Sequence, residues 1–122
     1  MAKIALVVDD SMVVRKLVSK TLNSIGFETV EAPNGREALE LAKKHADLAI
    51  IITDQNMPVM TGIEFIRALR AETGHRFTPV VFLTTESGDG TREEAREAGA
   101  TAWIVKPFNP EKVVSVVQRI AA

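Results

Sequence analysis

Short runs of apolar residues recur along the chain, and segments with a helical pattern separate them. Four of the runs contain Ile, Val and Leu without polar alternation, which is typical of strands buried on both faces of a sheet. These runs are Ile4–Val8, Leu48–Ile52, Val80–Leu83 and Trp103–Val105. A fifth segment, Phe27–Ala32, alternates Thr and Glu with apolar residues and is therefore expected nearer the edge of the sheet.

The segments between these runs have the periodicity and the capping residues of amphipathic helices. In the first segment, apolar residues share one helical face, and Gly26 is expected to end the helix. The members of that face are Val14, Leu17, Val18, Leu22 and Ile25. Residues that commonly cap helix starts open later segments: Asn34, Thr61 with Glu64, Thr91 with Glu94, and Asn109 followed by Pro110.

Strand and helix therefore alternate five times along the chain. Such alternation requires parallel strands joined by right-handed crossovers, with helices on both faces of the sheet. We expect one domain over residues 1–122, with an α/β fold built on a five-stranded, doubly wound parallel sheet.

Polar side chains follow the apolar runs at the point where each strand should end. Asp9 and Asp10 follow the first run, and Asp54 follows the run in the middle of the chain. Thr84 closes the next run, and Lys106 follows the last one. Because parallel sheets of this class hold their ligand at the carboxyl ends of the strands, we expect these side chains to converge on one rim.

The charges on that rim indicate a divalent cation and phosphoryl chemistry. Three carboxylates and one ammonium group leave two negative charges in excess. Oxygen ligands without histidine or thiolate favour Mg²⁺, or Mn²⁺, over zinc. A metal beside a lysine and a hydroxyl suits phosphoryl transfer, and the acceptor could be Thr84, Lys106 or an aspartate. Asp54 ends the central strand and is the best placed of these acceptors.

Composition removes several other classes of protein. Fifteen basic and sixteen acidic residues give a net charge of -1, which argues against a nucleic-acid partner. The absence of cysteine excludes disulfides and thiolate metal sites. The apolar runs are too short to span a bilayer, and no nucleotide-binding glycine motif is present. These features predict a cytoplasmic protein without a membrane partner.

Five motifs together resemble one family, the response regulator receiver domains, and within it the stand-alone chemotaxis regulators. The motifs occur in the family's order and spacing: Val7-Val8-Asp9-Asp10-Ser11, Thr53-Asp54-Gln55-Asn56-Met57-Pro58, Gly62, Thr84-Thr85-Glu86 and Lys106-Pro107-Phe108. The resemblance covers essentially the whole chain. It implies a flavodoxin-like sheet with strand order 2-1-3-4-5 and an output through protein binding.

The resemblance also implies the chemistry of the rim. Asp54 would accept a phosphoryl group from the phosphohistidine of a histidine kinase or phosphotransfer protein. Asp9, Asp54 and the backbone carbonyl of Asn56 would ligate Mg²⁺, and Asp10 would act mainly through metal-bound water. Asn56 and Glu86 would flank the attacking water and tune dephosphorylation.

A switch follows from the same resemblance. Lys106 and the Thr84 hydroxyl would hold phosphoryl oxygens, and the bond before Pro107 would be cis. Movement of Thr84 would free space for the aromatic side chain of Trp103, a position where the family usually has Tyr or Phe. The fourth helix, expected over Thr91–Ala98 behind a hinge of Gly88 and Gly90, would form the partner surface with the fifth strand and last helix.

Two other functions remain open from the sequence. One is a small phosphatase with Asp9 as nucleophile, similar to the haloacid dehalogenase-like phosphatases, although those usually carry an Asp-x-Asp pair and here Asp9 and Asp10 are adjacent. The other is an unphosphorylated receiver-like binding module, disfavoured because the acids and the lysine are all present. Gln55 is expected to be a solvated side chain, and His45 and His75 are expected to be structural.

Overall fold

Five parallel strands alternate with five helices in the computed structural model, which describes residues 3–85 and 89–121. The elements are β1 (Lys3–Val8), α1 (Met12–Asn23), β2 (Phe27–Ala32), α2 (Gly35–Lys44), β3 (Leu48–Asp54), α3 (Gly62–Glu72), β4 (Val80–Thr84), α4 (Asp89–Ala98), β5 (Ala102–Val105) and α5 (Pro110–Ala121). The strand order is β2-β1-β3-β4-β5, and all four pairings are parallel. The predicted fold class and strand order are confirmed.

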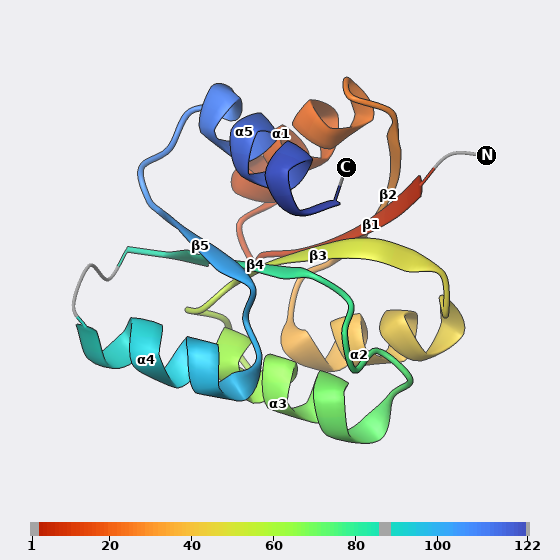
Figure 1. The fold of residues 1–122 in the computed structure, drawn as a ribbon, viewed down its shortest axis with the longest axis vertical. Coiled ribbons are helices and arrows are strands. Elements are labelled where there is room, and N and C mark those ends of the chain that lie inside the picture. Colours follow the sequence, from red (N-terminus) through yellow and green to blue (C-terminus); the bar gives the residue numbers. More distant parts are fainter. Residues whose placement is uncertain (1–2, 86–88, 122) are drawn as a thin grey trace.

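The sheet separates two hydrophobic cores. Helices α1 and α5 cover one face, and α2, α3 and α4 cover the other (Figure 1). Because successive side chains of a strand point to opposite faces, Leu6 and Val8 of β1 join one core, while Ala5 and Val7 join the other. Both faces of the strand are therefore buried, as its uninterrupted apolar run predicts.

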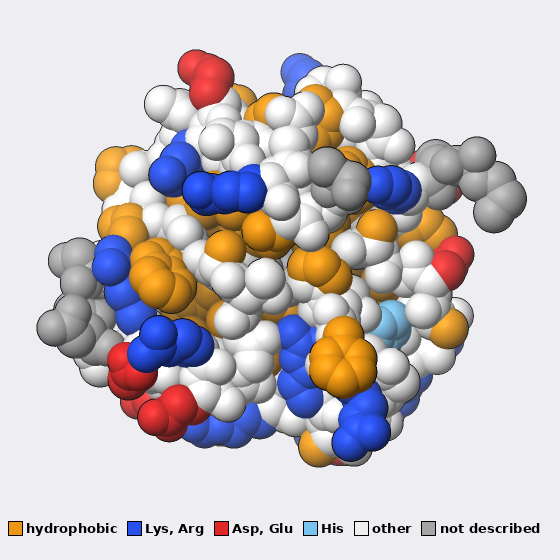
Figure 2. All heavy atoms as spheres, in the orientation of Figure 1, with side chains coloured by type: hydrophobic (Ala, Val, Ile, Leu, Met, Phe, Trp, Pro, Cys, Tyr) orange, Lys and Arg blue, Asp and Glu red, His pale blue; other side chains and the backbone are white. Residues whose placement is uncertain are grey.

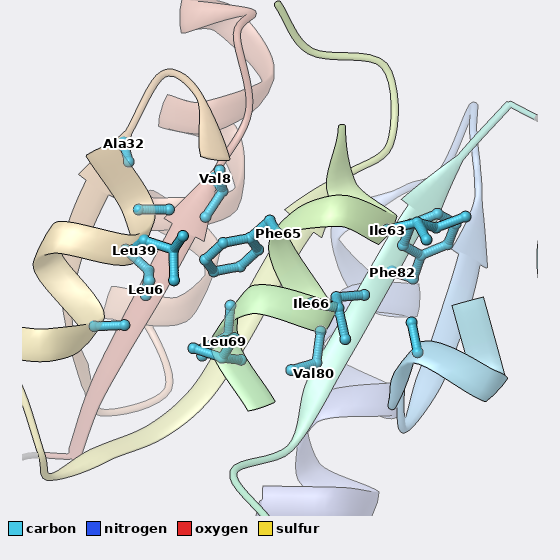
Figure 3. Close-up of a cluster of buried hydrophobic side chains, with 14 of the residues drawn as sticks. Leu6, Val8, Ala32, Leu39, Ile63, Phe65, Ile66, Leu69, Val80 and Phe82 are labelled. Carbon is cyan, nitrogen blue, oxygen red and sulfur yellow. The ribbon is translucent and has the colours of Figure 1, made fainter. Parts of the chain in front are cut away.

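The core beneath α2, α3 and α4 is built around large side chains of α3. Phe65, Ile66 and Leu69 are fully buried and point toward Leu6 and Val80 of the sheet (Figure 3). Burying side chains of this size stabilises the fold by about 1.5–3 kcal/mol each. Helix α3 is therefore firmly anchored beside the end of β3.

Three predicted helix starts are confirmed by hydrogen bonds from their caps. The Asn34 side chain accepts from the Glu37 amide at 2.9 Å, and the Asn109 side chain accepts from the Lys112 amide at 2.9 Å. Thr61 and Glu64 form the reciprocal pair of a capping box, at 3.2 and 2.8 Å. Each contact satisfies a backbone amide that the first turn of a helix leaves without a helical partner.

Two helix boundaries differ from the sequence prediction. Helix α1 ends at Asn23 with Ser24 as its cap, and Gly26, at φ 99°, serves the turn into β2 instead of capping the helix. Helix α4 begins at Asp89, so Gly90 and Thr91 lie in its first turn and Thr91 does not cap it. In both places the sequence located the helix but not the residue at its end, because helix ends depend on local hydrogen bonds.

Helix α4 has little apolar anchorage. Its buried apolar residues among those described are Ala95 and Ala98, and both side chains are small. The proposed hinge residue Gly88 lies outside the described residues. On α1, Leu17 was expected in the core but is 39% exposed, because the α1–α5 interface leaves a groove along it.

None of the helices within residues 3–85 and 89–121 combines the length and hydropathy that crossing a membrane requires.

Candidate functional site

Adjacent strands bring the predicted polar residues together at the carboxyl end of the sheet. Val8 of β1 is paired with Thr53 of β3, so Asp9 and Asp54 each follow by one residue at the same rim. Asp9 is 1% exposed and Asp54 is 4% exposed. Thr84, fully buried, ends β4 and is paired with Val105 of β5. The strand register therefore places two buried carboxylates side by side.

Lys106 joins these carboxylates. Its ammonium nitrogen Nζ lies 3.3 Å from Asp9 Oδ2 and 3.1 Å from Asp54 Oδ1. Its backbone amide donates to the Thr84 carbonyl at 2.8 Å, which continues the β4–β5 pairing by one residue. The Lys106–Pro107 peptide bond is cis, as the resemblance implies. Lys106 thus contacts two strand ends through its side chain and a third through its backbone.

Asp10 completes a cluster of three acids that could hold a cation. One carboxylate oxygen each of Asp9, Asp10 and Asp54 lies within 4.8 Å of the others, and Asp10 is exposed while its neighbours are buried. All of these ligand atoms are oxygens, and Asp10 faces solvent. This donor set fits a hard divalent cation such as Mg²⁺ that retains several water ligands.

The electrostatics of the cluster also favour a bound cation. Burial and the charge of Asp9 raise the pKa of Asp54, against the opposing effect of Lys106. Burial acts to lower the pKa of Lys106, but its hydrogen bond and charge interaction with Asp54, and the charge of Asp9, raise it overall. One ammonium group therefore does not balance the acids, and an added cation would favour their ionised forms.

The resemblance also assigns roles to Asn56 and Glu86. Asn56 is exposed two residues beyond Asp54, in the loop between β3 and α3. Glu86 lies outside the described residues. Their assignment to dephosphorylation stays a prediction.

Trp103 lies on β5 beside helix α4. It is partly buried against the core and is paired in register with Phe82 of β4. The Arg92 guanidinium of α4 lies 5.0 Å from the centre of its ring, within the range of a cation–π contact. These two residues help to line a hollow of about 570 Å³ with Phe108 and Lys112. Figure 2 shows basic and apolar side chains next to one another on this part of the surface.

Gln55 has a role that the sequence did not indicate. It was expected to be solvated, but its side-chain oxygen accepts from the Ile63 amide at 2.9 Å, and its backbone carbonyl accepts from the Gly62 amide at 3.0 Å. Both bonds attach the start of α3 to the end of β3. Gly62 lies so close that a Cβ at this position would collide with the Asp54 carbonyl oxygen. A contact between residues eight positions apart across a loop has no sequence periodicity that could reveal it.

Known proteins are similar to this chain over most of its length. A CheY homolog of Campylobacter jejuni, described as a chemotaxis protein, is 42% identical over 107 residues, covering 87% of this chain and 82% of the relative. The structure of chemotaxis protein CheY4 of Vibrio cholerae matches with a TM-score of 0.92 and 47% identity, covering 98% of this chain and 99% of that one.

A further structural relative is described with a metal. The receiver domain of the sensor histidine kinase PA1611 from Pseudomonas aeruginosa is 26% identical, with a TM-score of 0.89 and coverage of 99% of this chain and 98% of its own. That structure has a magnesium ion coordinated in its active-site cleft. The family model for the response regulator receiver domain matches residues 5–118. Since the match takes in every strand end that forms the acidic cluster, the chain belongs to the response regulator receiver domain family of two-component signalling.

Proposed function

We propose that the protein is a signalling switch that accepts a phosphoryl group on Asp54. The observation that carries this proposal is the position of the Asp54 carboxylate, buried at the end of β3, where it contacts the ammonium group of Lys106 that also contacts Asp9. A carboxylate can attack phosphorus without a general base, and aspartyl phosphates are a known type of intermediate.

The phosphoryl donor is the phosphohistidine of a histidine kinase or phosphotransfer protein. An Asp54 carboxylate oxygen attacks the phosphorus, so that an O–P bond forms while the N–P bond breaks. The electron pair of the broken bond remains on the imidazole nitrogen, which takes up a proton from solvent. Lys106 and the Thr84 hydroxyl hold oxygens of the transferred group, and the ammonium charge balances the charge that they carry.

The residues that would hold Mg²⁺, or Mn²⁺, are Asp9, Asp54 and the backbone carbonyl of Asn56, with Asp10 acting through a bound water. When bound, the ion supplies positive charge to the phosphoryl oxygens and fixes their orientation. Without an ion, the excess of carboxylates would repel an incoming phosphoryl group. The protein itself thus assists its own phosphorylation, and Asn56 and Glu86 tune the loss of the group.

The phosphorylated state changes the surface formed by α4, β5 and α5. Thr84 and Trp103 lie on neighbouring strands, so a phosphoryl group that draws Thr84 toward it alters the packing around the indole ring. Helix α4 is a suitable mobile element because its buried apolar side chains are two alanines. The similarity to chemotaxis proteins supports a target protein in chemotaxis.

Covalent labelling tests the acceptor. Acetyl phosphate with Mg²⁺ is expected to label the wild-type protein at a base-labile site, and Asp54→Asn is expected to abolish the label completely. Chelation of Mg²⁺ should do the same. A label that persists in Asp54→Asn but disappears in Asp9→Asn would contradict the proposal and favour a phosphatase with Asp9 as its nucleophile.

Fluorescence tests the switch. Beryllium fluoride, which mimics a bound phosphoryl group, should change the emission of Trp103, which is the single tryptophan of the chain. Lys106→Ala should still bind Mg²⁺ but lose the coupling between phosphorylation and partner affinity. An emission spectrum that beryllium fluoride leaves unchanged would remove Trp103 from the switch.

A further inference from the structure

Arg15 connects the acidic cluster to the neighbouring strand end. It lies on the first turns of α1, and its side chain is 13% exposed. Its Nη1 donates to the Asp9 backbone carbonyl at 2.8 Å, and its Nε pairs with Glu31 Oε1 at 3.0 Å. One guanidinium group therefore connects the loop that carries Asp9 and Asp10 to Glu31 near the end of β2.

Glu31 holds this guanidinium in place. It also accepts from Lys16 at 3.3 Å, and its side chain is 21% exposed. Burial acts to raise the pKa of Glu31, but the nearby Ser19 hydroxyl and the hydrogen bonds from Lys16 and Arg15 lower it overall. An ionised Glu31 therefore faces Arg15 over the neutral pH range, which makes their contact a charge-assisted hydrogen bond.

The contact with Arg15 completes a set of bonds that fixes Asp9. The Asp9 amide donates to the Ala32 carbonyl at 3.1 Å, Oδ1 accepts from the Ser11 amide at 2.9 Å, and Oδ2 faces Lys106 at 3.3 Å. The backbone carbonyl is the remaining polar group of this residue, and Arg15 binds it. Because a peptide unit is planar, fixing this carbonyl also fixes the amide and Cα of Asp10.

We propose that Arg15, held by Glu31, is a positioning residue that sets the Asp9–Asp10 peptide in the orientation needed to bind Mg²⁺. This inference rests on the proposed function, in which the acidic cluster takes that ion. Two effects of Arg15 on the ion oppose one another. Its positive charge alone would weaken cation binding, whereas the orientation that it imposes would strengthen binding. Whether Mg²⁺ affinity falls or rises when Arg15 is substituted therefore distinguishes a positioning role from an effect of its charge alone.

Calorimetric titration with MgCl₂ at fixed ionic strength provides the test, using the wild-type protein, Arg15→Lys, Arg15→Gln and Lys16→Gln. Lysine keeps the charge but cannot present two donors in the fork of a guanidinium. We expect both Arg15 variants to bind Mg²⁺ roughly tenfold more weakly, the range found when groups that orient metal ligands are removed. Lys16→Gln removes a positive charge that lies on the same helix and contacts the same Glu31, but it leaves every contact to Asp9 in place. This variant should bind Mg²⁺ within about twofold of the wild type.

Three results would overturn the inference. Arg15→Lys could bind Mg²⁺ as the wild type does, Arg15→Gln could bind it more tightly, or Lys16→Gln could weaken binding as much as Arg15→Lys. Any of these leaves the proposed Mg²⁺ site standing, whereas a wild-type protein that does not bind Mg²⁺ overturns the site itself. Arg15→Lys decides the matter alone if Arg15→Gln does not fold, and circular dichroism establishes the folded fraction of each variant.

Discussion

Two groups of buried polar side chains lie at opposite ends of β4, and they are satisfied in different ways. Before the strand, the ring of His75 is 3% exposed, with Nε2 2.8 Å from the Ala42 carbonyl and Nδ1 2.8 Å from Thr78 Oγ1. A carbonyl only accepts, so Nε2 carries a hydrogen, and the Thr78 hydroxyl can either donate to Nδ1 or accept from it. The imidazole thus has a partner for both of its nitrogens.

After the strand, the acidic cluster has fewer positive charges than carboxylates. Among the contacts of the described residues, Asp9 and Asp54 share the single ammonium group of Lys106, and the carboxylate of Asp10 lies beside them. Both groups of residues are polar and largely buried, but only the acidic one retains an excess of charge. The comparison teaches that burial of polar groups alone does not identify a functional site, whereas an unbalanced charge at a buried position does.

The largest expected effect is on the His75 side of this comparison. His75→Ala should lower the free energy of unfolding by about 3 kcal/mol, since it leaves a cavity and removes the partner of the buried Ala42 carbonyl. Mg²⁺ affinity should not change. Urea unfolding measures the first quantity and calorimetry the second. His45→Ala is the control, because His45 is only partly buried and should change stability by less than about 0.5 kcal/mol. A loss of Mg²⁺ binding in His75→Ala would contradict the conclusion that the His75 group serves stability alone.

Ligand-dependent stability should show the opposite pattern in the acidic cluster. Mg²⁺ at ten times its dissociation constant should raise the free energy of unfolding of the wild-type protein by about 1.4 kcal/mol, because only the folded state brings the three acids together. Asp54→Asn should show little of this gain at the same Mg²⁺ concentration. An equal gain in both proteins would place the ion elsewhere.

In the absence of Mg²⁺, Asp54→Asn should make the protein more stable, by about 1 kcal/mol. The reason is that burial and the charge of Asp9 make ionisation of Asp54 unfavourable in the folded protein, and asparagine is not ionised. The matched control is Asp47→Asn, which removes the same charge from an exposed position at the other end of β3. Urea unfolding in a chelating buffer gives both values, and a destabilised Asp54→Asn would show that the Lys106 pair outweighs the repulsion.

The smallest expected effect is the pH dependence of that difference. The pKa of Asp54 is raised in the folded protein above its ordinary value of 3.8, so the folded state binds this proton more tightly than the unfolded chain does. Ionised Asp54 therefore does not destabilise the wild-type protein at a pH below the ordinary pKa. The destabilisation appears as pH rises from the ordinary pKa through the raised pKa of the folded protein. The stability advantage of Asp54→Asn over the wild type should therefore lose most of its value of about 1 kcal/mol between neutral pH and about pH 3. An advantage that grows in acid would contradict the sign of this shift.

The sequence allowed the fold and the residues of the rim to be predicted because both follow from patterns with a fixed spacing. The apolar runs located the strands, and β2 was predicted with the bounds that the structure has, Phe27–Ala32. Parallel strands end at the same rim, so the residues after each run had to meet there. Asp9, Asp54 and Lys106 are found in contact for this reason.

Contacts that depend on loop shape were not accessible in the same way. The bond from the Ile63 amide to Gln55 and the bridge from Arg15 to Glu31 each join residues whose separation in sequence has no structural period. His75 was predicted to be structural from its lack of metal-ligand neighbours, but its partners Ala42 and Thr78 become visible only once α2 lies beside the loop before β4. Tertiary packing decides such pairs.

The contact between Gly62 and the Asp54 carbonyl has a mechanical consequence. Since no side chain separates the first turn of α3 from the end of β3, and two hydrogen bonds accepted by Gln55 join them, the helix is coupled closely to the backbone of Asp54. A chemical change at Asp54 therefore cannot be absorbed by sliding α3 away. In the proposed switch, displacement caused by a phosphoryl group on Asp54 would therefore fall on the less firmly packed neighbours of the pocket, such as helix α4.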